Sequence, residues 1–250
     1  MDGVENKVAV IVGGTSELGE TISIDFADGD AKVAVCDINQ EKVDSTVKKI
    51  MEKGKQAIGI AMNPAKSGEV KDAVDKIRSE FGKIDILVNN VDNSEGFEIS
   101  EVSDDRWDKS VDENLNATFY FCREVLPEMR KNKEGRIVNV TSLEYLGYPG
   151  ERVNYSATKS AIFGLTRSLA LEAAKELVTV NCVAKGDIAG PDIPEDKAEK
   201  MASVLPVKRL GTPGEIARAV GFFASEKGKR ITGQTLFVCG GKSTFCSMST

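Results

Sequence analysis

Apolar and helical segments alternate along the first 90 residues. Short apolar runs typical of buried β-strands lie at 7–12, 32–37, 56–61 and 84–90. Segments with a helical pattern lie between them, each followed closely by a glycine, at 16–28, 40–53 and 66–81. This part of the chain therefore predicts the order βαβαβαβ.

The alternation continues to the end of the chain. Helical patterns occupy 103–132, 153–175 and 213–225, and strand patterns occupy 136–142, 178–184 and 235–239. Apolar strands alternating with helices predict an α/β fold with a parallel sheet of about seven strands, covered on both faces. We see neither a linker nor a repeat, and we expect one domain over residues 1–250.

One segment interrupts this pattern. Residues 186–206 contain three prolines and many charges between a strand and a late helix. Loops of this length in compact domains are usually lids or disordered segments. We interpret this one as a substrate lid.

The charge and composition exclude several kinds of partner. The net charge is −6, with both signs scattered along the chain, which argues against nucleic acid. No apolar run approaches the roughly 20 residues that cross a bilayer, and the first residues do not resemble a signal peptide. We therefore expect a cytoplasmic protein that binds no membrane.

The residues available for chemistry are limited by the absence of histidine. Without imidazole, a Ser-His-Asp hydrolase and a His-ligated zinc enzyme are both impossible. Proton transfer must then use Tyr, Lys, Asp, Glu or Cys. The five cysteines are widely spaced without a C-x-x-C pair, which favours buried or idle thiols over disulfides or a metal site.

A glycine-rich loop follows the first predicted strand, from Gly13 to Gly19. Such a loop exposes backbone N–H groups at a helix N-terminus, where a pyrophosphate binds; the alternative is a tight turn without a ligand. Asp37 lies 24 residues after Gly13, at the end of the second strand. Its carboxylate can accept both hydroxyls of an adenosine ribose and repel a 2′-phosphate, which favours NAD over NADP. The alternative is a strand-end or helix-capping acid.

Tyr155 and Lys159 are four residues apart in a predicted helix, so their side chains share one face. A phenol with a pKa of about 10 must drop by about 3 units to act as a base near neutral pH. An ammonium about 4 Å away supplies an effect of that size. Ser142 ends a strand and can hydrogen-bond a substrate oxygen, or simply a strand-end carbonyl. Asn114 is costly inside a helix unless its amide has a task.

Together these residues resemble the short-chain dehydrogenase/reductase family. The resemblance covers essentially the whole chain, in order, and rests on the glycine-rich loop, Asp37, the Asn pair at 89–90, Asn114, Ser142, Tyr155, Lys159 and the ending ITGQTLFVCGG. It implies a Rossmann-type, doubly wound sheet, a secondary-alcohol or ketone substrate, and a homotetramer. Parts of the sequence are similar to reductases of 3-oxoacyl thioesters and dehydrogenases of cyclic hydroxyacyl-CoA, so the substrate class stays open between a simple alcohol or ketone and an acyl thioester.

The resemblance also implies a role for each residue. Tyr155 exchanges a proton with the substrate oxygen, and Lys159 lowers its pKa and holds the nicotinamide ribose. Ser142 positions the substrate oxygen, and Asn114 fixes a water that links Lys159 to solvent. No metal is implied. The implied cofactor contacts are Gly13, Thr15, Ser16, Leu18, Gly19, Asp37, Ile38, Asn63, Asn90, Tyr155, Lys159, Gly186 and Ile188.

The chain departs from the family pattern at positions along the expected cofactor path. These are Glu17 for the middle glycine of the loop, Val91-Asp92 for Ala-Gly, Asn63 for an adenine-contacting Asp, Lys185 for Pro, and Gly190 for a Thr. Glu17 either points outward, where it complements the helix dipole, or inward, where it weakens binding of a pyrophosphate. The departures leave a second hypothesis open, a catalytically weak family member that acts as a binding or scaffold subunit.

Overall fold

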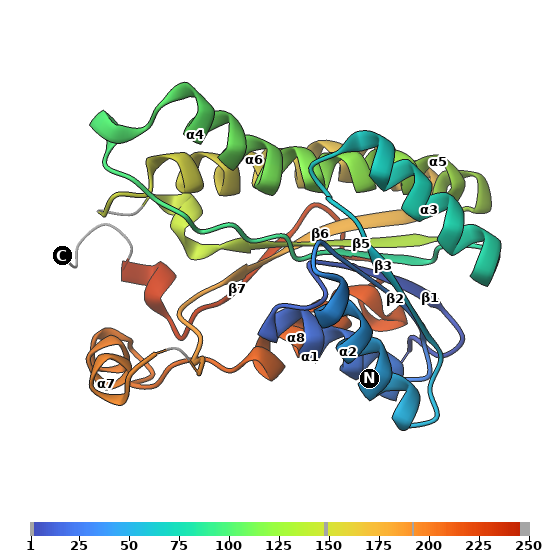
Figure 1. Cartoon of the computed structure of the whole chain (residues 1–250), viewed down its shortest axis with the longest axis horizontal. Helices are drawn as coiled ribbons and strands as arrows, with labels where there is room; N and C mark the ends of the chain where they lie inside the picture. Colours follow the sequence, from blue (N-terminus) through green and yellow to red (C-terminus); the bar gives the residue numbers. More distant parts are fainter. Residues whose placement is uncertain (1–2, 148–149, 192, 246–250) are drawn as a thin grey trace.

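Seven parallel strands form one sheet in the computed structural model, which describes residues 3–147, 150–191 and 193–245 (Figure 1). Their order in space is β3-β2-β1-β4-β5-β6-β7. The strands are β1 (Val8–Val12), β2 (Lys32–Asp37), β3 (Ala57–Ala61), β4 (Ile86–Asn89), β5 (Gly135–Ser142), β6 (Val178–Lys185) and β7 (Thr235–Val238). The sequence-based prediction of an α/β fold with a seven-stranded parallel sheet is confirmed.

Helices cover both faces of the sheet (Figure 1). One face carries α3 (Ser67–Phe81), α4 (Asp104–Ser110), α5 (Ala117–Asn132) and α6 (Val153–Ala173). The other carries α1 (Glu17–Asp28), α2 (Gln40–Glu52) and α8 (Pro213–Ala224). Helix α7 (Glu195–Val204) lies away from the sheet.

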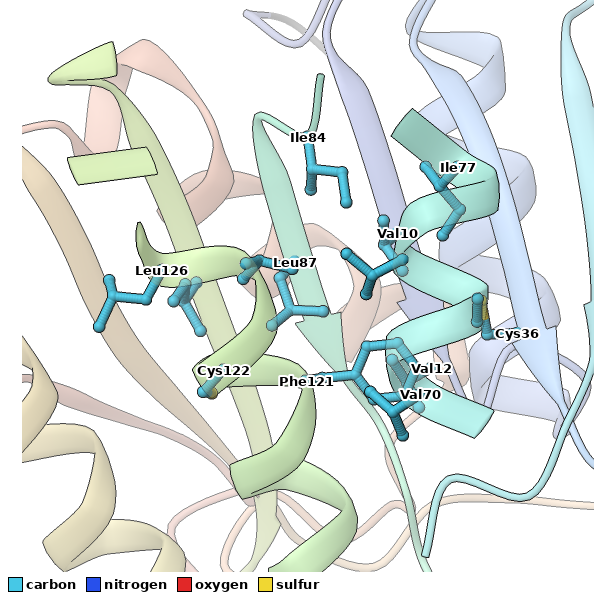
Figure 2. Close-up of a cluster of buried hydrophobic side chains, with 14 of the residues drawn as sticks. Val10, Val12, Cys36, Val70, Ile77, Ile84, Leu87, Phe121, Cys122 and Leu126 are labelled. Atoms are coloured by element: carbon cyan, nitrogen blue, oxygen red, sulfur yellow. The ribbon is translucent and has the colours of Figure 1, made fainter. Parts of the chain in front are cut away.

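The strands are apolar throughout because they contribute to a core on each face. In β1, Val10 and Val12 belong to the core under α3 and α5, whereas Ala9 and Ile11 belong to the core under α1 and α8. Figure 2 shows the first of these cores, with Phe121 from α5 directed toward Val12. This two-sided burial gives the strands continuous apolar runs instead of alternating ones.

The strand order reverses between β1 and β4. The chain builds the sheet outward through β2 and β3, returns to place β4 on the other side of β1, and then continues through β5 to β7. In open α/β sheets, ligands bind at such a switch point, beyond the carboxyl ends of the strands. Both the glycine-rich loop after β1 and the Asn90 segment after β4 lie at this point.

Two segments differ from the sequence-based prediction. The helical stretch 103–132 is divided into α4, a π-helical turn η2 (Val111–Asn116) and α5. The segment 186–206, expected to be a loop, contains helix α7. Among the described residues, no helix combines the length and apolar character needed to cross a membrane. Cys36, Cys122, Cys182 and Cys239 are buried free thiols, and Cys246 lies outside the described residues.

Candidate active site

The glycine-rich loop turns tightly between β1 and α1. Gly13 has a φ of +70°, and a Cβ atom there would lie 2.5 Å from the carbonyl oxygen of Asn90. A Cβ on Gly19 would lie 2.0 Å from the carbonyl oxygen of Gly13. Ser16 caps α1 by accepting from the Gly19 N–H at 3.1 Å, and the Asn90 side chain donates to Ser16 Oγ at 3.0 Å. Close packing therefore requires glycine at positions 13 and 19. The loop presents the N-terminus of α1 to the switch point.

Asp37 is held at the end of β2 by the same loop. Its Oδ2 accepts from the Thr15 N–H at 3.0 Å and from the Thr15 hydroxyl at 2.7 Å, and its Oδ1 accepts from the Ile38 N–H at 2.7 Å. Ile38 is 65% exposed. The carboxylate is thus fixed beside the loop, with an exposed apolar side chain next to it.

The other expected cofactor contacts have different surroundings. Leu18 is buried in the core beneath α1. The side-chain Oδ1 of Asn63 accepts from the Ala65 N–H at 2.9 Å, which makes Asn63 a turn residue after β3. Gly186 follows β6 and packs against Cys239, where a Cβ would lie 2.6 Å from the Cys239 Cα. Ile188 pairs with Gly211 in an isolated bridge.

Helix α6 brings Tyr155 and Lys159 to the carboxyl ends of β4 and β5. Both lie on its buried face, Tyr155 2% exposed and Lys159 1% exposed. The Lys159 ammonium lies 5.3 Å from the centroid of the Tyr155 ring. Ser142 ends β5, where its Oγ accepts from the Glu144 N–H at 3.2 Å, and the hydroxyl of Ser142 partly offsets the raised pKa of Tyr155. The structure therefore brings Ser142, Tyr155 and Lys159 together.

Asn114 occupies the π-helical turn that packs against α6. Its amide accepts from the Asn93 N–H at 3.0 Å and donates to the Asn93 carbonyl at 3.0 Å and the Ser110 carbonyl at 3.1 Å. Asn114 thus fixes the segment that follows β4. This contact gives the buried amide a structural task.

Asp92 is the residue at the centre of the site. Its Oδ1 accepts a 2.6 Å hydrogen bond from the Tyr155 hydroxyl and lies 3.2 Å from Lys159 Nζ. Its Oδ2 forms a 2.5 Å ion pair with Lys185. Lys159 also donates to the Val91 carbonyl at 2.7 Å. Asp92 and Lys185 both depart from the family pattern. They therefore form one cluster with the expected catalytic pair, Tyr155 and Lys159.

This cluster changes the acidity of its members. Burial raises the pKa of Tyr155 far above its ordinary value, and the negative charge of Asp92 and its hydrogen bond raise it further. Burial by itself would raise the pKa of Asp92, but Lys159 and Lys185 outweigh it and lower that pKa well below its usual range. Burial also lowers the pKa of Lys159, an effect that Asp92 opposes. In this arrangement the phenol is less acidic than a free one, because it is buried beside a carboxylate.

Glu17 points toward the segment that follows β6. One of its carboxylate oxygens lies 3.3 Å from the position that a Cβ on Gly190 would occupy. A side chain at 190 would come close to this carboxylate, which lies at the end of a flexible, exposed side chain. Glu17 has no positive φ, and its replacement of glycine carries no backbone strain. Glu17 is exposed, and its carboxylate reaches toward Gly190.

The site fits the adenosine half of a dinucleotide more readily than the nicotinamide half. Asp37 provides the carboxylate that the adenosine half requires, at the end of β2 beside the loop, where the Thr15 N–H donates to it. At the nicotinamide half, Asp92 already receives the hydrogen bonds of Tyr155 and an ion pair from Lys159. No cluster of three or more metal-binding side chains occurs within residues 3–147, 150–191 and 193–245.

A doubly wound sheet with a glycine-rich first turn and a Ser-Tyr-Lys set defines a dinucleotide-dependent oxidoreductase. In comparisons with known families, residues 7–202 match the family described as short chain dehydrogenase. The chain belongs to this short-chain dehydrogenase family and is an NAD(P)-dependent oxidoreductase that acts on CH–OH groups.

Several relatives are similar over almost the whole chain. The chain is 40% identical over 243 residues to the (2S)-[(R)-hydroxy(phenyl)methyl]succinyl-CoA dehydrogenase subunit BbsC of Thauera aromatica, covering 97% of both chains. It is 36% identical to the 3-oxoacyl-[acyl-carrier-protein] reductase FabG of Staphylococcus epidermidis, covering 94% of this chain and 98% of the relative. The crystal structure of levodione reductase superposes with a TM-score of 0.91 at 26% identity, covering 96% of this chain and 98% of that one.

Sequence reasoning missed the role of Asp92. It noted that positions 92 and 185 differ from the family pattern, but it did not pair them, because they lie 93 residues apart. A signal was present: both positions end or follow strands that were expected in one parallel sheet, so their side chains meet at one edge.

Proposed function

We propose that this protein is an NAD(H)-dependent oxidoreductase that interconverts a secondary alcohol and a ketone. The observation that carries the proposal is the meeting of Ser142, Tyr155 and Lys159 at the carboxyl edge of β4 and β5, beside the glycine-rich loop. When bound, the nicotinamide supplies or accepts the hydride. Tyr155 carries the proton at its hydroxyl oxygen, and Ser142 holds the substrate oxygen beside it.

The experiment that tests this function measures NADH oxidation with a panel of ketones. We expect steady turnover by the wild-type protein and none by Tyr155→Phe, which keeps the ring but removes the hydroxyl. Equal activity of the two proteins would contradict the assignment of Tyr155. Thermal unfolding of both proteins is the control for folding.

NAD is proposed over NADP because of Asp37. The carboxylate is fixed by Thr15 and Ile38 at the end of β2, where a 2′-phosphate would meet a negative charge. We expect NADH to bind at least about tenfold more tightly than NADPH, and Asp37→Ser to reduce that preference. A preference for NADPH in the wild-type protein would contradict this choice.

An acyl thioester is the proposed substrate class. Two of the similar proteins are named for a CoA thioester and an acyl-carrier-protein thioester, respectively. Lys197 and Lys200 are exposed on α7, within the proposed lid 186–206, where they can meet an anionic carrier. We expect 3-oxoacyl thioesters to be reduced with a higher kcat/KM than the matching simple ketones. Reversal of the charges at 197 and 200 is expected to raise KM for thioesters only.

The domain organisation, oligomeric state and cellular location of the enzyme are also proposed. We infer one domain over 1–250 and a cytoplasmic enzyme from the sequence, and a homotetramer from the family resemblance. Light scattering of the purified protein measures the assembly. Limited proteolysis tests the lid, because a bound ligand would protect 186–206 from cleavage.

A second candidate function is a catalytically weak binding subunit. It is favoured by the hydrogen bond that joins Tyr155 to Asp92, which uses the hydroxyl expected to meet substrate. The similar Thauera aromatica proteins BbsC and BbsD are named as subunits of a dehydrogenase. Turnover no greater than that of Tyr155→Phe, with retained binding of a partner chain, would support this candidate.

A further inference from the structure

We propose that Asp92 is an internal ligand of Tyr155 and Lys159 that competes with the nicotinamide ribose, and that Lys185 holds it in place. This inference rests on the proposed function, because it concerns how the same site admits its cofactor. It assigns a new positioning role to two residues, Asp92 and Lys185.

The first step is that both carboxylate oxygens are engaged. Oδ1 lies 2.6 Å from the Tyr155 hydroxyl and 3.2 Å from Lys159 Nζ, and Oδ2 lies 2.5 Å from Lys185 Nζ. A carboxylate between two cations and a phenol donor is strongly held, because charge-assisted hydrogen bonds are about twice as strong as neutral ones. Asp92 will therefore leave this position only if other acceptors replace it.

The second step is that Lys159 has little freedom to bind another group. Its side chain is 1% exposed, and two of its three donor directions are used by the Val91 carbonyl and Asp92. A ribose hydroxyl that accepts a hydrogen bond from Lys159 would meet the Asp92 carboxylate. The two ligands present the same chemistry, an oxygen acceptor, to the same buried ammonium.

The third step concerns the path of a dinucleotide across the sheet. The loop and Asp37 place the adenosine half over β1 and β2, and the strand order β2-β1-β4-β5 places the second ribose near the ends of β4 and β5. Asp92 follows β4 immediately after Val91. Its side chain therefore lies where the second ribose must pass, whereas the adenosine half is unaffected.

The fourth step is the role of Lys185. It ends β6 directly beside Ser142 in the sheet register, which places its ammonium at the same edge as the catalytic pair. Lys159 alone would balance the charge of Asp92. Lys185 adds a second cation that engages the other oxygen, and it is more accessible, with 23% of its side chain exposed. We infer that Lys185 makes the contact persistent.

The experiment compares three ligands that contain successively more of the cofactor: ADP, ADP-ribose and NADH. Calorimetry measures their affinities for the wild-type protein and for Asp92→Asn, which keeps the size of the side chain and removes its charge. We expect ADP to bind both proteins equally, within about twofold. We expect ADP-ribose and NADH to bind Asp92→Asn at least about tenfold more tightly than wild type.

Matched variants separate this effect from a general change of charge. Glu95 lies in the same loop and pairs with Lys109 at 3.2 Å, so Glu95→Gln removes one negative charge away from the cluster. It is expected to change all three affinities by less than about twofold. Asp92→Gly provides a second variant if Asp92→Asn folds poorly, and the melting temperature of each variant is measured without ligand.

Lys185 is tested in a double-mutant cycle. Lys185→Met is expected to tighten ADP-ribose binding, by a smaller factor than Asp92→Asn, and to add nothing when Asn already occupies position 92. Independent effects of the two substitutions would overturn the role of Lys185.

The outcomes also distinguish this inference from the proposed function. If ADP binds but neither variant at position 92 improves ADP-ribose binding, Asp92 is not a competitor and the inference is overturned. If ADP, ADP-ribose and NADH bind to none of the proteins, the proposed NAD(H)-dependent function fails, and the inference fails with it.

Discussion

The Asn90 carbonyl oxygen lies 2.5 Å from the position that a Cβ atom on Gly13 would occupy. This contact joins the loop after β1 to the segment after β4, across the point where the strand order reverses. It explains why the first glycine of the loop cannot carry a side chain. The same contact leads to the first prediction.

Gly13→Ala is expected to destabilise the protein by at least ~1–3 kcal/mol, because position 13 has a φ of +70° and no room for a methyl group. Urea unfolding measures the change. Gly68→Ala is the matched control, since a Cβ there would meet no atom within 4 Å in α3. A loss of stability as large in the control would show that the Asn90 contact is unimportant.

Glu17→Gln is expected to tighten the binding of both ADP and NADH, because the carboxylate lies next to the loop that would bind a pyrophosphate. This pattern differs from that of Asp92→Asn, which should leave ADP unchanged. Glu41→Gln removes an acid from the first turn of α2 and serves as the control. Equal affinities in wild type and Glu17→Gln would show the Glu17 charge to be irrelevant.

The pH dependence of alcohol oxidation is expected to shift in Asp92→Asn. Tyr155 acts as a base only when its hydroxyl is ionised, so the rate rises as pH increases through its pKa. Burial and the adjacent Asp92 charge raise that pKa, and removing the charge lowers it. The rising limb of kcat/KM against pH should therefore move to lower pH in the variant. A limb that stays in place would contradict the influence of Asp92 on Tyr155.

Phe121→Ala is expected to cost ~3–5 kcal/mol of unfolding free energy, because this fully buried ring fills the core between α3, α5 and the sheet (Figure 2). Phe119→Ala is a suitable comparison in the same helix, since Phe119 is 39% exposed. Its cost should be clearly smaller. Urea denaturation of both variants checks the difference, and similar costs would argue against the assigned core.

Much of the architecture could be predicted because it depends on local patterns. The strands are apolar runs bounded by turns, and α1 ends at Gly29, as the sequence indicates. Helix α7 was missed because its residues are charged, follow prolines and bury no side chain, so no apolar period marks it. The π-helical turn at Asn114 was missed because its pattern is that of an ordinary helix.

The sequence by itself determined the class of fold, the glycine-rich turn and the spacing of Tyr155 and Lys159 on one helix face, because each depends on residues close together in the chain. Only the tertiary structure decided what surrounds that pair. Parallel strands bring the ends of β4, β5 and β6 to one edge, and there Asp92 meets Lys185 from 93 residues away. The acidity of Tyr155 depends on that meeting, since an ionisable group responds to burial and to the charges that the fold places beside it.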